Sequence, residues 1–243
     1  MSRTDIASPP VRSARSVVVI GGTGGIGYAI AKFHADRGCE VVITGRDAAR
    51  TSAIAEQLGG DVHGIALDIA EPEMIERALA GIGHVDRLAL VAVERDFNSA
   101  RNYDIARARR IVTLKLIGYT EVAHTLFPRM GAGASAVLFG GLASERPYPG
   151  STSITTVNGA VSSLIRTLAV ELAPVRFNAV HPGIISDSPA WREKKEAIAQ
   201  IEERTPGGRL ATTEDVVGAV DFLFTNNGVN GINLVIDGGW LLT

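Results

Sequence analysis

Short apolar segments rich in β-branched residues alternate along this chain with longer segments of helical periodicity. The first short segment, SVVVI at residues 16–20, is apolar throughout its interior and stops at a pair of glycines. A strand that is apolar on both faces is typical of a parallel sheet covered by helices on both sides. The same pattern predicts seven strands, at residues 16–20, 40–44, 62–67, 87–93, 135–139, 176–180 and 233–236.

The segments between these strands predict helices. Apolar residues recur at helical spacing after the first strand, Asp47 is suited to cap the second helix, and Pro72 stands near the start of the third. The expected helices cover residues 25–37, 47–58, 72–82, 100–127 and 150–174. Strands that alternate with helices through right-handed crossovers give an α/β fold. We therefore expect a single-domain, Rossmann-like, doubly wound sheet of seven parallel strands over residues 16–243, preceded by a flexible tail at residues 1–15.

Composition narrows the classes of protein that fit. A net charge of −2 provides no general attraction to nucleic acid or to an anionic membrane. Cys39 is the only cysteine, so no intrachain disulfide forms, and the five histidines show no ligand spacing, which predicts no metal site. No segment approaches 18 consecutive apolar residues, and the first 16 residues lack an apolar signal segment. We expect no membrane span and a cytoplasmic location.

A glycine-rich turn, GGTGGIG at residues 21–27, lies directly between the first strand and its helix. In this context Gly21 permits a tight turn, while Gly25 and Gly27 leave room for a pyrophosphate beside the backbone. The free N–H groups at the start of the helix favour the phosphates. The alternative is an ordinary tight turn without a ligand. The expected cofactor contacts in this turn are Gly21, Thr23, Gly24, Gly25, Ile26 and Gly27.

The end of the second strand indicates which nucleotide is preferred. An acid there would bind the adenosine ribose, but the chain reads Thr44-Gly45-Arg46. Arg46 is suited to pair with a 2′-phosphate, so we expect NADP(H) to be preferred over NAD(H). The alternative is that Arg46 is a solvated surface side chain. Asp68 and Ile69, after the third strand, are expected beside the adenine, unless Asp68 only caps the next turn.

From residue 16 to the C-terminus the chain resembles the short-chain dehydrogenase/reductase family. The glycine spacing matches that family's TGxxxGxG motif, and TGR at residues 44–46 is similar to its NADP-preferring members. Further matches are VD at 85–86, NAV at 178–180, PG at 182–183 and DGGW at 237–240. The resemblance implies a nicotinamide-dependent oxidoreductase that acts on a small molecule as a homo-oligomer, a dimer or tetramer. It also implies cofactor contacts at Ala92, Pro182, Gly183, Ile184 and Ile185.

The catalytic positions of the family are altered in this chain. In the family a tyrosine acts as general acid/base, a lysine supports it and binds the ribose, a serine holds the substrate oxygen, and an asparagine supports a water. Counting back from the ELAP sequence at residues 171–174, the tyrosine and lysine positions hold Ile154 and Asn158. The serine position at the end of the fifth strand holds Gly141, and the asparagine of the family's NxxG pattern is Lys115, at residues 115–118. Isoleucine cannot donate a proton, and a positioned acid contributes about 10²–10⁴-fold to such reactions. Ordinary ketoreductase activity is therefore expected to be weak.

Two residues are exchanged relative to the family pattern: Lys115 stands at the asparagine position and Asn158 at the lysine position. An ammonium can therefore persist in the pocket, approached from the opposite helix. The alternative is that Lys115 extends into solvent. Tyr148 is a weaker catalytic candidate in the loop before the long helix, and His181 is weaker still. Residues 186–209 occupy the place of the family's substrate lid, where Trp191 either covers an apolar substrate or anchors a surface helix.

Three functions remain open from the sequence. The first is an atypical NADP(H)-dependent oxidoreductase acting on a small carbonyl or alcohol with non-standard catalytic groups. The second is a catalytically inactive nucleotide-binding or structural subunit of a hetero-oligomer that contains an active relative. The third is a lyase, cyclase or isomerase that uses the same scaffold without redox change.

Overall fold

Seven parallel strands form one sheet in the computed structural model, which describes residues 15–243. The strand order is β3-β2-β1-β4-β5-β6-β7, so the order reverses between β1 and β4. The strands are β1 (Ser16–Ile20), β2 (Glu40–Gly45), β3 (Val62–Ala66), β4 (Val85–Leu90), β5 (Met130–Phe139), β6 (Arg176–Pro182) and β7 (Asn233–Ile236). The predicted fold class, a doubly wound seven-stranded parallel sheet, is confirmed. The tail predicted at residues 1–15 lies outside the described residues except for Arg15.

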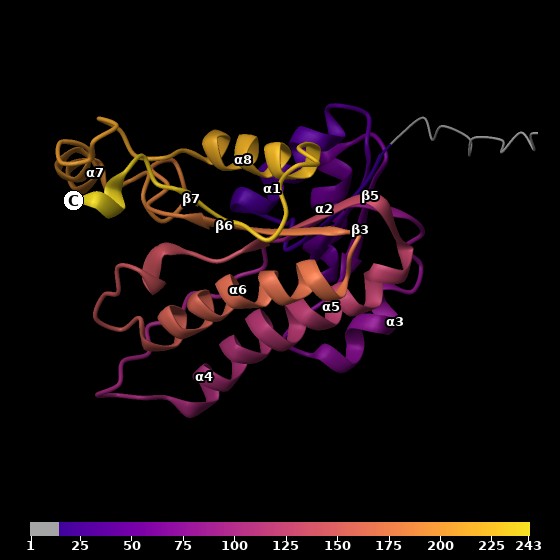
Figure 1. The fold of residues 1–243 in the computed structure, drawn as a ribbon, viewed down its shortest axis with the longest axis horizontal. Coiled ribbons are helices and arrows are strands. Elements are labelled where there is room, and N and C mark those ends of the chain that lie inside the picture. The colour runs from indigo at the N-terminus through magenta and orange to yellow at the C-terminus, as the bar shows by residue number, and fades with distance from the viewer. Residues whose placement is uncertain (1–14) are drawn as a thin grey trace, which may run out of the picture.

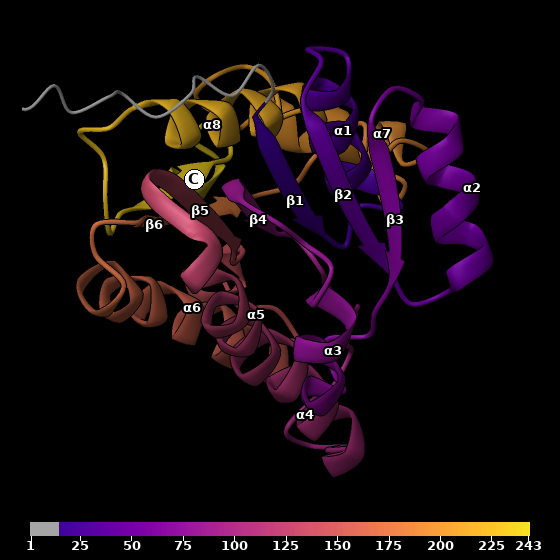
Figure 2. The same cartoon turned by 90° about the vertical axis from the view of Figure 1, so that its right-hand side faces the viewer.

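Helices cover both faces of the sheet. Helices α1, α2 and α8 pack on one face, and α3, α4, α5 and α6 pack on the other (Figures 1 and 2). The bounds are α1 (Gly25–Ala35), α2 (Ala48–Leu58), α3 (Ile75–Leu79), α4 (Ile105–Val112), α5 (Tyr119–Leu126), α6 (Thr152–Glu171), α7 (Lys195–Glu202) and α8 (Thr213–Thr225). A π-helical turn, Thr113–Gly118, joins α4 to α5. Such a turn widens a helix locally and is frequent at functional sites.

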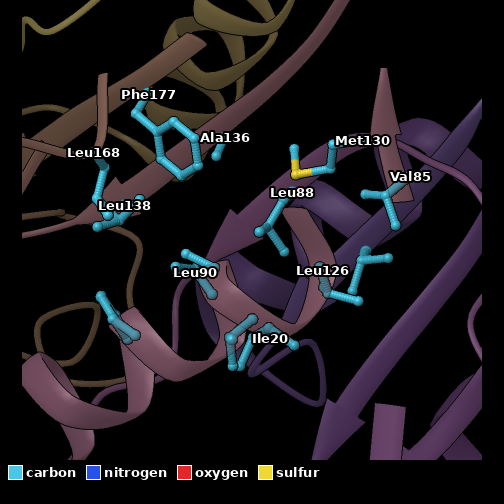
Figure 3. Packing of buried hydrophobic residues seen from close by; sticks show 14 of the residues in the cluster. Ile20, Val85, Leu88, Leu90, Leu126, Met130, Ala136, Leu138, Leu168 and Phe177 are labelled. Carbon is cyan, nitrogen blue, oxygen red and sulfur yellow. The ribbon is translucent and has the colours of Figure 1, made fainter. Parts of the chain in front are cut away.

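The two helical layers enclose two separate apolar cores, which explains the continuous apolar runs in the strands. In β1, Val18 and Ile20 face one core, while Val17 and Val19 face the other. The first core contains Leu88 and Leu138 of the central strands, together with residues of α5 and α6 (Figure 3). Because successive side chains of a strand point to opposite faces, a strand between two cores must be apolar at every position.

One predicted strand ends earlier, and one predicted helix begins later, than the sequence pattern suggests. The strand predicted at 87–93 ends at Leu90, because the N–H groups of Val91 and Ala92 both donate to the Ile20 carbonyl, each at 2.9 Å. The helix predicted at 100–127 begins only at Ile105. Asn98 holds the preceding loop through two hydrogen bonds to the Asp104 backbone, at 2.8 and 2.9 Å. A side chain that bonds neighbouring backbone groups competes in this way with helix formation.

The helix predicted at 72–82 is also shorter than expected, since only Ile75–Leu79 is α-helical. Helix α8 has no counterpart among the helices predicted from the sequence. Its start is fixed by Thr212 and Asp215, which exchange hydrogen bonds as a capping box. Helix α2 begins as predicted, with the Asp47 carboxylate accepting from the Arg50 N–H at 2.7 Å.

Candidate functional site

A cavity of about 560 Å³ lies at the carboxyl ends of β1 and β4, where the strand order reverses. Ligands of doubly wound sheets bind at this point. Thirteen of the fourteen predicted cofactor contacts line this cavity: Gly21, Thr23, Gly24, Gly25, Ile26, Gly27, Arg46, Asp68, Ile69, Ala92, Pro182, Gly183 and Ile185. The exception is Ile184, which lines an adjoining cavity instead.

The glycine turn has the geometry that a dinucleotide requires. Gly21 has a φ of +90°, and a Cβ on it would lie 2.7 Å from the Ala92 Cα. A Cβ on Gly27 would overlap the Gly21 carbonyl oxygen, whereas one on Gly25 would meet no atom within 4 Å. Gly24, at the N-cap of α1, has no side chain that could bond the first amides of the helix. The turn therefore fits a pyrophosphate at the start of α1.

Arg46 stands at the mouth of this cavity within a chain of charged side chains. Its Nη1 lies 3.2 Å from Glu94 Oε1, and Glu94 also accepts from Arg110 Nε at 2.7 Å. Arg110 reaches Asp68 Oδ2 at 2.8 Å, while Asp68 Oδ1 accepts from the Ala70 N–H at 3.0 Å. Asp68 therefore caps a turn and lines the cavity at the same time, so the two interpretations of this residue are compatible.

Sequence reasoning missed a second arginine beside Arg46. Arg50, in the first turn of α2, lines the same cavity, and its Nη2 donates to the Thr23 carbonyl at 3.3 Å. Arg46 precedes the Asp47 cap and is not part of the helix, so no local sequence pattern indicated that Arg50 lines the same cavity.

A second cavity, of about 700 Å³, adjoins the first. Pro182 and Gly183 line both cavities, as does Trp191 from the predicted lid. The other walls of the second cavity include Ile154 and Asn158 of α6, Tyr148, and Trp240 from the C-terminal segment. Trp240 was noted in the sequence only as part of a matching motif, because nothing local indicates that the C-terminal segment returns to the site.

The two ends of the predicted lid, residues 186–209, lie next to each other. A bridge between Ile185 and Ala211 holds its ends together, and the Ser186 N–H donates to the Ala211 carbonyl at 3.0 Å. The segment contains α7 and reaches Trp191, whose ring lies 4.6 Å from the Lys194 ammonium. Trp191 therefore lies where a substrate cover would be. Movement of this segment stays a prediction.

Lys115 points into the protein from the π-helical turn. It is only 1% exposed, lines the first cavity, and donates from Nζ to the Phe139 carbonyl at the end of β5. The alternative in which Lys115 extends into solvent is therefore wrong, because the π-helical turn directs the side chain into the core. Burial lowers the pKa of Lys115 from its ordinary value of 10.5 to about 7.

Larger side chains from other elements pack against Gly140 and Gly141, the glycine pair after β5. A Cβ on Gly140 would overlap the His181 ring, and a Cβ on Gly141 would lie 2.8 Å from Asn158 Nδ2. The Gly141 N–H donates to His181 Nδ1 at 3.2 Å, so the neutral ring carries its proton on Nε2 and donates to Asn233 Oδ1 at 2.8 Å. His181 and Asn158 therefore occupy the space that side chains at residues 140 and 141 would need.

This packing predicts that Gly140→Ala destabilises the protein. The added methyl group overlaps a buried ring that hydrogen bonds hold on both sides, and overpacking of this kind costs about 1–3 kcal/mol. Urea unfolding measures the loss. Gly83→Ala is the matched control, because a Cβ there meets nothing within 4 Å. A Gly140→Ala variant as stable as that control would show that the His181 ring is not fixed.

The remaining candidates lie at the rim of the second cavity. Tyr148 lines it but is 47% exposed, and its backbone N–H donates to Ser151 Oγ at 3.0 Å. In the same loop, the Ser144 hydroxyl donates to the Gly141 carbonyl at 3.2 Å. A catalytic role of Tyr148 stays a hypothesis.

None of the helices in residues 15–243 is long and apolar enough to cross a membrane. Within the same range, His, Cys, Asp and Glu side chains do not gather into a group of three that could hold a metal ion.

Known proteins resemble this chain over nearly its full length. A family model described as enoyl-(acyl carrier protein) reductase matches residues 21–241. L-xylulose reductase of Bos taurus is 31% identical over 95% of this chain and 98% of its own length. Carbonyl reductase [NADPH] 2 of Sus scrofa is 26% identical over 94% and 97%, respectively.

Solved structures show the same similarity. The MalC reductase/Diels-Alderase of Malbranchea aurantiaca has a TM-score of 0.87 and 25% identity over 95% of this chain and 97% of that chain. A short-chain dehydrogenase/reductase of Brucella melitensis has a TM-score of 0.86 and 28% identity, over 93% and 96%. Fold, glycine turn and full-length similarity agree: the chain belongs to the short-chain dehydrogenase/reductase family of oxidoreductases, whose members use a nicotinamide cofactor.

Proposed function

We propose that this chain is an NADP(H)-dependent oxidoreductase that acts on a small carbonyl or alcohol with non-standard catalytic groups. The observation that carries the proposal is the pair of adjoining cavities that share Pro182 and Gly183. One cavity has the shape and amide donors for a dinucleotide. The other is lined largely by apolar and aromatic side chains, as small-molecule sites are.

When bound, the nicotinamide supplies the hydride chemistry, and the chain's residues supply binding and orientation. The glycine turn and the start of α1 hold the pyrophosphate, and Pro182 and Gly183 back the nicotinamide. Ile154, at the position of the family's tyrosine, contributes an apolar wall in place of a proton donor. The proton must therefore come from elsewhere.

Lys115 is the residue we assign to the nicotinamide side of the nucleotide cavity. Its amine lies against the Phe139 carbonyl, next to Gly140, which also lines that cavity. An amine whose pKa is about 7 holds and releases a proton near neutral pH, which is the property that acid/base catalysis requires. Asn158, on the other side, is assigned to the substrate cavity.

NADP(H) preference is assigned to Arg46, with Arg50 beside it. We expect Arg46→Ala to weaken NADPH binding by about 10-fold and to leave NADH binding nearly unchanged, because only the 2′-phosphate loses a charge-assisted partner. Titration calorimetry with both nucleotides measures the ratio. Arg166→Ala is the control, since Arg166 is exposed on α6 and lines neither cavity. An unchanged NADPH/NADH ratio in Arg46→Ala contradicts the assignment.

Self-association through the α4–α6 side is part of the proposal. Ile105, Ile117 and Val170 of this side are 60%, 51% and 77% exposed, respectively. A homo-oligomer, a dimer or tetramer, would bury them, and a hetero-oligomer with an active relative would do so equally well. Light scattering of the purified chain distinguishes the two.

NADPH oxidation at 340 nm over a panel of small carbonyl compounds tests the proposed reaction. Turnover that requires NADPH supports it. Tight NADPH binding without turnover, together with copurification of a related chain, would instead indicate an inactive subunit. Catalysis that continues after the cofactor is removed would indicate a lyase, cyclase or isomerase.

A further inference from the structure

An ion pair connects the two strands that flank β1 at the first cavity. Arg46 directly follows β2 and Glu94 comes four residues after β4, and Arg46 Nη1 donates to Glu94 Oε1 at 3.2 Å. In the sheet β1 lies between β2 and β4, and both side chains line the cavity. A nucleotide bound at the carboxyl end of β1 therefore meets the arginine and the carboxylate together.

Glu94 is held in this position by a second arginine. Its other carboxylate oxygen, Oε2, accepts from Arg110 Nε at 2.7 Å, and Arg110 is fixed in turn by Asp68 Oδ2 at 2.8 Å. Arg46 has no such support: among residues 15–243, Glu94 is the only acid within ion-pair distance of it. Arg46 can therefore change its partner while Glu94 stays on Arg110.

The contact between Arg46 and Glu94 is also the weaker side of this network. The two side chains are 62% and 33% exposed, respectively, and an exposed ion pair contributes little to stability. A 2′-phosphate carries more negative charge than a carboxylate and binds a guanidinium through parallel charge-assisted bonds. The phosphate of NADP(H) is thus able to displace Glu94 from Arg46, but Glu94 opposes the exchange.

The same carboxylate is favourable for a nucleotide without the phosphate. An acid at the end of β2 would accept a hydrogen bond from the ribose 2′-hydroxyl, and this chain has Thr44-Gly45-Arg46 there instead. Glu94 brings a carboxylate beside residue 46 from a different strand.

We propose that Glu94 is a specificity-determining residue that limits the preference for NADP(H). Its carboxylate competes with the 2′-phosphate of NADP(H) for Arg46, and it accepts from the adenosine ribose 2′-hydroxyl of NAD(H). This inference rests on the proposed function and deepens it, because the 2′-phosphate is assigned there to Arg46.

Titration calorimetry on the full chain tests the competition, with NADPH, NADH and adenosine 2′-monophosphate as the three probes. The variants are Glu94→Gln, which keeps the shape of the side chain and removes its charge, Arg46→Ala, and the double variant that carries both changes. Glu73→Gln is the matched control, because Glu73 is exposed and lines neither cavity.

We expect Glu94→Gln to bind NADPH and adenosine 2′-monophosphate about 5-fold more tightly, since Arg46 is then free for the phosphate. NADH should bind about 3-fold more weakly, because a neutral amide is a poorer acceptor for the ribose hydroxyl than a carboxylate. The NADPH/NADH affinity ratio should therefore rise at least about 10-fold. In the Arg46→Ala background the tightening of NADPH should fall below about 2-fold, because the two residues act on each other.

An unchanged NADPH/NADH ratio in Glu94→Gln, or equal tightening of both nucleotides, would overturn the inference. So would a gain that persists in full without Arg46, or one that Glu73→Gln reproduces, since either result would indicate net charge alone. Wild type that binds adenosine 2′-monophosphate but neither dinucleotide would refute the proposed function, while the monophosphate still tests the competition for Arg46. Wild type that binds none of the three probes would overturn both.

Discussion

Gly27→Ala is expected to abolish nucleotide binding, with an NADPH affinity at least about 100-fold weaker than that of wild type, equivalent to about 2.7 kcal/mol. A Cβ at this position overlaps the Gly21 carbonyl oxygen, which belongs to the turn itself. The clash involves backbone rather than a flexible side chain, so only a shift of the turn relieves it. That shift moves the α1 amides away from the pyrophosphate.

The control for this variant is Gly81→Ala, where a Cβ meets nothing within 4 Å. Circular dichroism shows whether each variant is folded, and calorimetry with NADPH measures the affinity. A folded Gly27→Ala variant that binds NADPH as tightly as wild type would contradict the assignment of the glycine turn. A variant that fails to fold is replaced by Gly24→Val, because Gly24 lines the same cavity with an extended backbone (φ −178°) and a Cβ there meets only Arg50 Nη2, at 3.5 Å.

Lys115→Met is expected to stabilise the protein at neutral pH while it removes activity. The difference between a pKa of about 7 and the ordinary 10.5 corresponds to a burial cost of about 5 kcal/mol, at 1.36 kcal/mol per pKa unit. The variant also leaves the Phe139 carbonyl without its donor, which costs about 1–3 kcal/mol. The net expectation is a gain of about 2–4 kcal/mol at pH 7.

The sign of the pH dependence follows from linkage. Between pH 7 and 10.5 the unfolded chain holds a proton on Lys115 that the folded protein has released, so wild-type stability rises with pH in this window. The advantage of Lys115→Met should therefore shrink as pH rises from 7 and disappear by about pH 10. Urea unfolding at several pH values measures it, with Lys195→Met, at an exposed position of α7, as control.

The same variant tests function. If Lys115 binds the cofactor or transfers a proton, Lys115→Met loses at least about 10-fold in NADPH affinity or in turnover while it gains stability. A gain in stability with unchanged NADPH binding and unchanged turnover would show that the buried amine is not part of the site. A uniform loss of stability at all pH values would contradict its burial as a neutral amine.

The fold and the nucleotide cavity could be predicted from the sequence because their signals are local. Each strand carries its own apolar run, and the glycine turn follows the first strand directly. The predicted start of the helix at residues 100–127 was wrong. Asn98 and Asp104 form a loop there through side-chain hydrogen bonds, which periodicity does not reveal. Helix α8 was missed, although Thr212 and Asp215 form a capping box.

The substrate cavity could be predicted only in part, because its walls are brought together by the fold. Alignment to the family pattern located Ile154, Asn158 and Lys115, but not how they pack. The pairing of Gly140 with His181 joins two strands and is visible only when both are placed side by side. Gly140 and Gly141 therefore each make room for a larger neighbour, His181 and Asn158, respectively.

The most direct test of this account is the binding of NADPH and NADH to the full chain by titration calorimetry. We expect NADPH to bind with a Kd on the order of 1–100 μM, and NADH to bind at least about 10-fold more weakly. Both values follow from the glycine turn, the open start of α1 and the Arg46–Arg50 pair. Absence of detectable binding of either nucleotide would contradict the account at its centre.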